Sequence, residues 1–175
     1  LLLRALARLD PLDGGEVRWK GSAVRRDAVP RFRREVLYLH QRATMLSDRV
    51  ETALKRPLAL AAYRGRPFDR GRVTEMLKQL GRDASFLDKP ANELSGGEMQ
   101  IMALVRALQL DSCVLLLDEP TAALDLPTAL AAEQLVWQWF AASPAQRAVI
   151  WVTHDAQQAA RTGQSALHME QGRIA

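Results

Sequence analysis

The chain has 175 residues, of which 48% are hydrophobic and 25% charged, so it has the ordinary composition of a globular domain. It contains no run of about 18 apolar residues that would span a membrane, and its single cysteine, Cys113, excludes an internal disulfide and a cysteine-based metal site. Much of the net charge of +4 lies within residues 18–34, and because this stretch lacks the regular aromatic interleaving of a base-stacking surface, we expect a solvated surface and no nucleic-acid partner.

Short helical and extended patterns alternate over the first forty residues. Leucines at helical spacing predict a helix over residues 1–9. The residues on its apolar face are Leu2, Leu3, Leu6 and Leu9. After a turn, alternation over residues 16–21 predicts an exposed strand. We interpret residues 25–34 as a polar connection and residues 36–39 as a short strand that leads to Gln41.

Helical periodicity then replaces these short runs, and prolines and glycines divide the stretch into several helices. A longer helix is predicted from Ser95 to about Leu110. We expect residues 42–103 to form a helical subdomain, set between the two parts of an α/β core at residues 1–41 and 104–175.

Two continuous apolar runs in the last third of the chain predict parallel strands buried on both faces. They cover residues 114–117 and 149–152, and a predicted helix of about residues 127–141 lies between them. A short helix and a weak strand near residues 166–169 follow. Strands that alternate with helices indicate an α/β fold.

Four polar features follow these strands or open the long helix. Gln41 and His154 each follow a strand, the pair Asp118 and Glu119 follows another, and residues 95–97 (Ser-Gly-Gly) open the helix. In parallel α/β sheets, ligands bind beyond the carboxyl ends of the strands. Three of the four features therefore stand where a ligand binds, and the fourth is a helix N-terminus.

Each feature has both a functional and a structural interpretation. The glycines and unpaired N–H groups at residues 95–97 suit a phosphate, although a serine N-cap followed by flexible glycines has the same sequence. Asp118 suits Mg²⁺ and Glu119 suits activation of a water, while an acidic cap for the next helix is the alternative. His154 suits a hydrogen bond to a transferring phosphate, or an ordinary turn.

Together, the longer motifs resemble the ATP-binding cassette (ABC) family. Residues 94–100 (LSGGEMQ) match its signature motif, residues 114–125 (VLLLDEPTAALD) its Walker B strand and D-loop, and residues 149–155 (VIWVTHD) its switch-histidine loop. Gln41 matches the Q-loop glutamine, and residues 16–21 look like the family's antiparallel β region. The resemblance implies a P-loop-NTPase-like α/β cassette with a mostly parallel core sheet, an antiparallel part and a helical subdomain.

The resemblance also implies the motor subunit of an ABC transporter, an ATPase that couples ATP hydrolysis to transport through a membrane permease. The implied cofactors are ATP and Mg²⁺. The implied partners are the permease and a second ATPase subunit, in a homodimer or pseudo-dimer, peripheral on the cytoplasmic side of the cell membrane. Residues 41–57, with the signature and switch motifs, look loosely similar to the ATPases of metal (iron) exporters, and other import and export systems stay open.

Single residues receive roles from the same resemblance. Glu119 would be the general base, and His154 would contact the γ-phosphate. Asp118 would hold Mg²⁺ together with Gln41, which would also contact the attacking water at the bound ATP. The ATP bound to the opposite subunit would be contacted by Ser95, Gly96, Gly97 and Glu98. Asp125 would lie across the dimer interface.

The family's phosphate-binding loop, G-x-x-x-x-G-K-[ST], does not occur in the sequence, and residues 1–6 resemble the helix that follows it. We therefore expect a cassette truncated at its N-terminus, with weak binding of its own ATP and no activity alone. The alternatives are a non-enzymatic regulatory or degenerate remnant and a non-transport ABC ATPase. For the latter, the segment between Gln41 and Leu94 is too short for a long coiled-coil insertion.

Apolar residues early in the helical segment exceed what short helices need for their own packing. We expect some of them to form an exposed groove that binds a short helix of the permease. The alternative is that all of them form the segment's own core. The set comprises Met45, Leu46, Val50, Leu54, Leu58, Leu60 and Tyr63.

Overall fold

A three-stranded parallel sheet lies at the centre of the computed structural model, which describes residues 2–40, 49–170 and 172–174. The strands are β3 (Val36–Leu39), β4 (Val114–Asp118) and β5 (Ala148–Val152), with β4 in the middle. Leu39 pairs with Leu117, and Asp118 pairs with Val152, so the carboxyl ends of all three strands lie at one edge of the sheet. The predicted α/β class with a parallel core sheet is confirmed.

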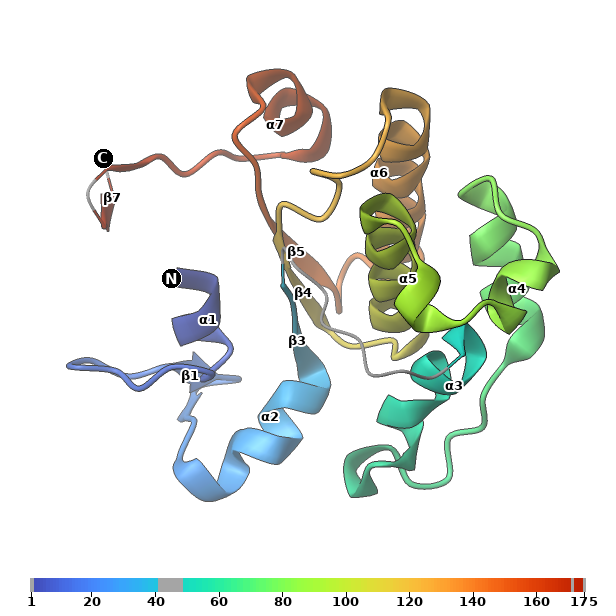
Figure 1. Cartoon of the computed structure of the whole chain (residues 1–175). Helices are drawn as coiled ribbons and strands as arrows, with labels where there is room; N and C mark the ends of the chain where they lie inside the picture. Colours follow the sequence, from blue (N-terminus) through green and yellow to red (C-terminus); the bar gives the residue numbers. More distant parts are fainter. Residues whose placement is uncertain (1, 41–48, 171, 175) are drawn as a thin grey trace.

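Each face of the sheet has its own hydrophobic core. The covering helices are α1 (Leu2–Leu6) on one face, and α5 (Gly96–Gln109) and α6 (Leu126–Ala141) on the other (Figure 1). Leu115 and Leu117 belong to the core under α5 and α6, whereas Leu116 belongs to the core under α1. All three are at most 1% exposed, because side chains alternate between the faces of a strand that is covered on both sides.

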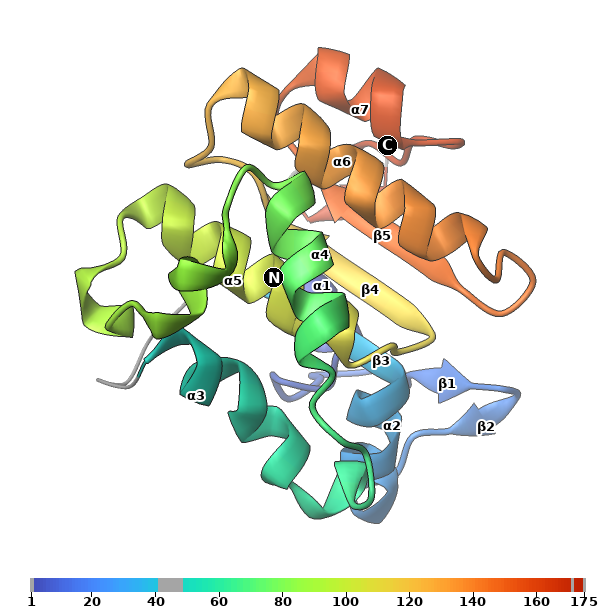
Figure 2. The same ribbon diagram turned by 90° about the vertical axis from the view of Figure 1, so that its right-hand side faces the viewer.

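The helical segment packs against α5 (Figure 2). Its elements are α3 (Val50–Lys55), η2 (Arg56–Ala59), η3 (Ala61–Tyr63), α4 (Arg70–Gln79), η4 (Ala84–Asp88) and η5 (Ala91–Glu93). One continuous core joins this segment to α5, α6 and the sheet, so the proposed subdomain boundary at residue 103 falls inside α5 and crosses packed side chains.

Five of the seven residues in the apolar set of the helical segment lie in the described part of the chain, and three of these five are buried. The buried members are Val50, Leu54 and Tyr63. Leu58 is half-buried and Leu60 is 59% exposed, while Met45 and Leu46 lie outside the described residues. The three buried side chains lie in the interior, so they do not contribute to an exposed groove, and the expected groove stays a prediction for the exposed members of the set.

The N-terminal segment departs from the sequence prediction. Helix α1 ends at Leu6, and it buries Leu3 together with Ala7, whereas Leu2 and Leu9 are exposed. Arg8, with φ of 56°, turns the chain away from the helix direction. The predicted apolar face is therefore correct for Leu3 and Leu6, which pack in the core, and wrong for Leu2 and Leu9. Leu9 lies beyond the end of the helix.

Residues 18–35 form a hairpin and two helical elements. The elements are β1 (Arg18–Trp19), β2 (Ser22–Ala23), η1 (Arg26–Ala28) and α2 (Val29–Glu35). The predicted polar connection is thus helical. Pro30 stands in the first turn, where a proline fits a helix, and Phe32 is buried between the arginines.

The last elements extend from the sheet edge. They are α7 (Ala156–Thr162), β6 (Met169–Glu170) and β7 (Arg173–Ile174). Strand β5 was predicted to be buried on both faces, but it pairs only with β4 in the described structure, and Ile150 is 42% exposed. Among the described residues, no helix is long and apolar enough to cross a membrane.

Candidate active site

Glu119 and His154 meet at the carboxyl edge of the sheet. Glu119 directly follows β4, and His154 follows β5, the neighbouring strand. His154 Nε2 lies 2.9 Å from Glu119 Oε1. The imidazole is 89% exposed and the carboxylate only 19%, so a partly buried carboxylate is covered by a histidine that faces solvent. A carboxylate of this kind can orient a water, and the adjacent N–H can reach a bound anion.

Asp118 is held by a residue that the sequence analysis did not select. The Tyr38 hydroxyl donates a hydrogen bond of 2.8 Å to Asp118 Oδ2. Burial, followed by the neighbouring Asp118, raises the pKa of Tyr38 to about 12, so the phenol keeps its proton and stays a donor at neutral pH. Tyr38 lies on β3 and pairs with Leu116, which is two residues before Asp118 on β4. Only this strand pairing identifies Tyr38 as a partner of Asp118.

The backbone of Glu119 is strained. Its φ of 47° is in the left-handed region, which is uncommon for a non-glycine residue and especially before a proline, here Pro120. The Glu119 N–H donates to the Val152 carbonyl at 3.0 Å, which ties the strained residue to β5. Strained residues of this kind persist only where the surroundings hold them, and they gather at functional sites.

Ser95 is the N-cap of α5. Its hydroxyl oxygen accepts the Glu98 N–H at 3.2 Å, and the Glu98 carboxylate accepts the Ser95 N–H at 3.0 Å, which forms a capping box. Lys89 Nζ lies 2.7 Å from the same carboxylate. Lys89 and then the Ser95 N–H lower the pKa of Glu98 to about 2, so Glu98 is ionised and occupied within its own chain. The structural interpretation of Ser95 as an N-cap is therefore correct, and Ser95 itself is exposed.

The two signature glycines have different surroundings. A side chain at Gly97 would place its Cβ 2.9 Å from the Ala123 carbonyl oxygen, closer than real Cβ atoms come. At Gly96 the nearest atom would be the Ala123 Cβ at an ordinary 3.8 Å. Gly97 is thus required by packing of α5 against the D-loop of the same chain, a reason that the sequence alone did not indicate.

The remaining predicted site residues are placed less completely. Asp125 is exposed and precedes the first turn of α6, where its carbonyl accepts the Ala129 N–H at 2.8 Å. Gln41 lies outside the described residues. Within the described part of the chain, no three or more His, Cys, Asp or Glu side chains gather as a metal site.

Comparison with known proteins identifies the family. A family profile described as "ABC transporter" matches residues 1–122. The chain belongs to the ABC transporter family. A phosphonates import ATP-binding protein of Nostoc sp. is 36% identical over 183 residues, covering 99% of this chain and 72% of the relative. The ABC transporter ATP-binding protein YjkB of Bacillus subtilis is 33% identical over 162 residues, covering 93% of this chain and 62% of the relative.

Solved ABC cassettes share the fold. The dimeric structure of the ATP-binding cassette MJ0796, in a post-hydrolysis state with ADP and Pi, has a TM-score of 0.78 and 28% identity, covering 92% of this chain and 72% of the cassette. The motifs of this chain are thus those of an ABC ATPase, a family that hydrolyses ATP. This chain spans about two thirds of the length of these relatives.

A buried polar network connects two helices of the cassette. Gln158 Nε2 donates to the Thr121 hydroxyl at 2.9 Å and to Glu133 at 2.7 Å. Arg161 adds two hydrogen bonds to Glu133, at 3.0 and 3.1 Å. Burial acts to raise the pKa of Glu133, yet the bonds from Arg161 and Gln158 hold it below its usual value. The network fixes α7, which follows His154, to α6 and to the turn after Glu119.

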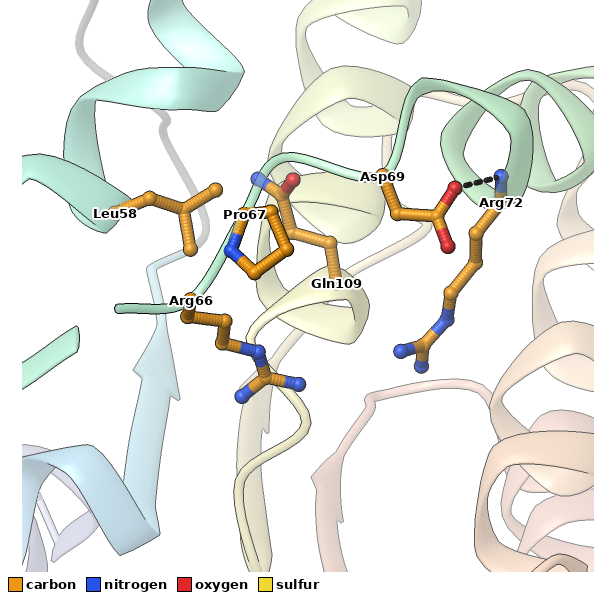
Figure 3. A pocket seen from close by; sticks show the side chains of 6 residues that line it. All are labelled: Leu58, Arg66, Pro67, Asp69, Arg72 and Gln109. Carbon is orange, nitrogen blue, oxygen red and sulfur yellow. Dashed lines mark hydrogen bonds between the residues drawn. The ribbon is translucent and has the colours of Figure 1, made fainter. Parts of the chain in front are cut away.

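A hollow of about 200 Å³ lies beside Gln109 (Figure 3). Gln109 is the last residue of α5, at the opposite end of the helix from Ser95. The hollow is lined by Leu58, Arg66, Pro67, Asp69, Arg72 and Gln109. Arg66 donates to the Leu110 carbonyl, and Arg72 donates to the Leu108 carbonyl at 3.3 Å. Both guanidinium groups therefore satisfy carbonyls at the C-terminus of α5, where cations are favourable, which is a structural role.

Proposed function

We propose that this chain is the ATP-hydrolysing motor part of an ABC transporter and acts through a membrane permease. The observation that carries the proposal is the contact of 2.9 Å between Glu119 and His154, beside Asp118, at the carboxyl edge of a parallel sheet. Relatives named for phosphonates import, nickel import and macrolide export support a transport role without selecting a substrate or a direction. The metal-exporter likeness gains no particular support from these names.

In the proposed mechanism Glu119 is the general base. Its carboxylate is held against His154, so a water bound there would lose its proton to the oxygen that the imidazole does not engage. The His154 Nε2–H faces Glu119 in this structure, so this N–H would turn from the carboxylate to the γ-phosphate, on the exposed side of the imidazole, as the bond to the leaving group breaks. Asp118 would contribute an oxygen ligand to Mg²⁺, whose chemistry is to neutralise charge on the phosphates. A site with few protein carboxylates fits this ion, which usually keeps several waters and binds through substrate phosphates.

The N-terminus of α5 would serve the ATP of a second subunit. Ser95 and Gly96 are exposed there, and the first N–H groups of a helix attract phosphate. Glu98 is engaged by Lys89 and by the Ser95 N–H, so its contact with ATP would require those bonds to open. Asp125, exposed at the start of α6, would lie at the same interface.

A hybrid protein tests the proposal. A segment that carries the family's phosphate-binding loop, G-x-x-x-x-G-K-[ST], would be joined ahead of Leu1 of this chain. We expect Mg²⁺-dependent ATP turnover that rises more than linearly with protein concentration, and we expect Glu119→Gln to lower it by at least about 100-fold. Turnover that is unchanged in Glu119→Gln would refute the role of Glu119. The 175-residue chain without that loop serves as the control, and we expect no measurable turnover from it.

A further inference from the structure

Gln100 is a buried amide beside the proposed active site. It lies one turn after Gly96 on α5 and is 8% exposed. The mechanism above does not use it. A buried amide must find partners for both its N–H₂ and its carbonyl group, so its contacts identify what it holds.

Both partners of Gln100 are backbone groups of the turn that carries Glu119. Gln100 Nε2 donates to the Glu119 carbonyl at 3.3 Å, and Gln100 Oε1 accepts the Ala123 N–H at 2.8 Å. A carbonyl can only accept and an N–H can only donate, so the orientation of the amide is fixed. The side chain therefore bridges the two ends of the turn from Glu119 to Ala123.

One end of this Gln100 bridge is the carbonyl of Glu119, the residue with the strained backbone. Glu119 has φ of 47°, and its carbonyl also accepts the Ala122 N–H at 3.3 Å. Such a conformation is kept only when neighbouring groups determine it. We propose that Gln100 is a positioning residue, which holds the Glu119 backbone so that the carboxylate points at His154. Only its consequence for ATP turnover rests on the proposed role of Glu119 as the base.

The same helix contacts the turn a second time. Gly97, one residue after Gly96, lies so close to the Ala123 carbonyl that no side chain fits between them. Ala123 is thus held twice: Gln100 accepts a hydrogen bond from its N–H, and Gly97 packs against its carbonyl oxygen. A displacement of the helix start, where Ser95 is exposed, moves the turn and with it Glu119.

Another buried glutamine of the same helix provides a matched control. Gln109 is 7% exposed, and its Nε2 donates to the Leu54 carbonyl at 2.7 Å. Its loss removes a buried amide from α5 without touching the Glu119 turn. Gln100→Met and Gln109→Met therefore have similar general effects on the fold, and only the first removes the bridge.

The test uses NMR on the 175-residue chain. The sequence has three histidines, so a His154→Asn variant assigns the His154 ring signals. We expect Gln100→Met to shift the His154 ring signals and to speed hydrogen exchange of the Ala123 amide by about 10-fold or more. Gln109→Met leaves both unchanged. Gln100→Glu keeps an acceptor for the Ala123 N–H but loses the donor to Glu119, so it shifts His154 with a smaller change in Ala123 exchange.

A double variant separates positioning from general loosening. When Glu119→Gln is already present, adding Gln100→Met should produce little further change in the His154 signals, because the contact that Gln100 orients has been altered. His154 signals that ignore Gln100→Met, or that respond equally to Gln109→Met, would overturn the proposal. Full ATP turnover by the Glu119→Gln hybrid would instead overturn the function proposed for Glu119. The NMR result would still show whether Gln100 positions the Glu119 carboxylate.

Discussion

Replacing Gly97 by alanine should destabilise the protein, whereas the same change at Gly96 should not. The added Cβ at position 97 would lie 2.9 Å from the Ala123 carbonyl oxygen and 3.4 Å from Leu124 Cδ2. The carbonyl belongs to a turn held by Gln100, so it cannot yield without disturbing that bridge. Overpacking of this kind costs about 1–3 kcal/mol. Replacing glycine by alanine inside a helix returns up to about 1 kcal/mol.

The two variants share the gain in helix propensity, and only one carries the clash. The difference between Gly97→Ala and Gly96→Ala should therefore be about 1–3 kcal/mol in the free energy of unfolding. For a chain of this length, that corresponds to a Tm lower by roughly 2–12 °C. Equilibrium urea unfolding with equal m-values, together with a thermal scan, measures both quantities.

The comparison also has a clear contrary outcome. If Gly97→Ala is as stable as Gly96→Ala, then the D-loop does not pack against α5 as described, and the close approach to Ala123 has no energetic consequence. The wild-type chain and both variants should be measured in the same buffer without nucleotide. Binding of ATP then cannot contribute to the difference.

Further expectations follow from other contacts. Arg161→Ala should leave buried Glu133 with fewer partners and lower stability by about 1–3 kcal/mol, whereas Arg31→Ala, at an exposed position on α2, should change it by less than about 0.5 kcal/mol in the same urea titration. Glu98→Gln should cost about 1 kcal/mol at pH 7. Because the folded pKa of Glu98 is depressed to about 2, the stabilisation exists above its unfolded pKa near 4.3, and urea titrations between pH 5 and pH 2 should show it being lost, with the wild type and Glu98→Gln converging. Leu60→Asp should leave stability nearly unchanged but reduce co-purification of the hybrid with a permease partner, and retention of the complex would place the docking surface elsewhere.

The parallel sheet could be predicted from the sequence because its signal is local. Four consecutive apolar residues before Asp118 are typical of a strand that is covered on both faces, and Leu115, Leu116 and Leu117 are indeed buried. The polar residues after such runs were predicted as site residues for the same reason, and β4 and β5 bring Glu119 and His154 together. Strand β5 has an equally apolar sequence, but exposure at a sheet edge depends on which strands neighbour it, and no residue of β5 encodes that.

Partners that lie far apart in the sequence could not be predicted. Tyr38 and Asp118 are 80 positions apart, and they meet only because β3 and β4 pair in one particular register. Glu133 and Arg161 look like ordinary charged residues on two helices, yet Glu133 is buried and Arg161 donates two hydrogen bonds to it. In the apolar set of the helical segment, the composition could not distinguish a core position such as Leu54 from an exposed one such as Leu60.

The signature helix therefore has two faces with separate requirements. Ser95 and Gly96 are exposed at its start, as a binding site for a ligand from outside the chain needs, while Gly97 and Gln100 face the turn of the same chain that carries Glu119. Under the proposed function, a loss of ATP turnover on substitution of Gly97 would have two physical causes, a lost phosphate contact and a displacement of Glu119, the proposed general base. Substitution of Gly96 affects mainly the first. If Ser95 contacts a second subunit as proposed, α5 would connect that contact to the turn that carries Glu119, because Gly97 and Gln100 of the same helix pack against this turn.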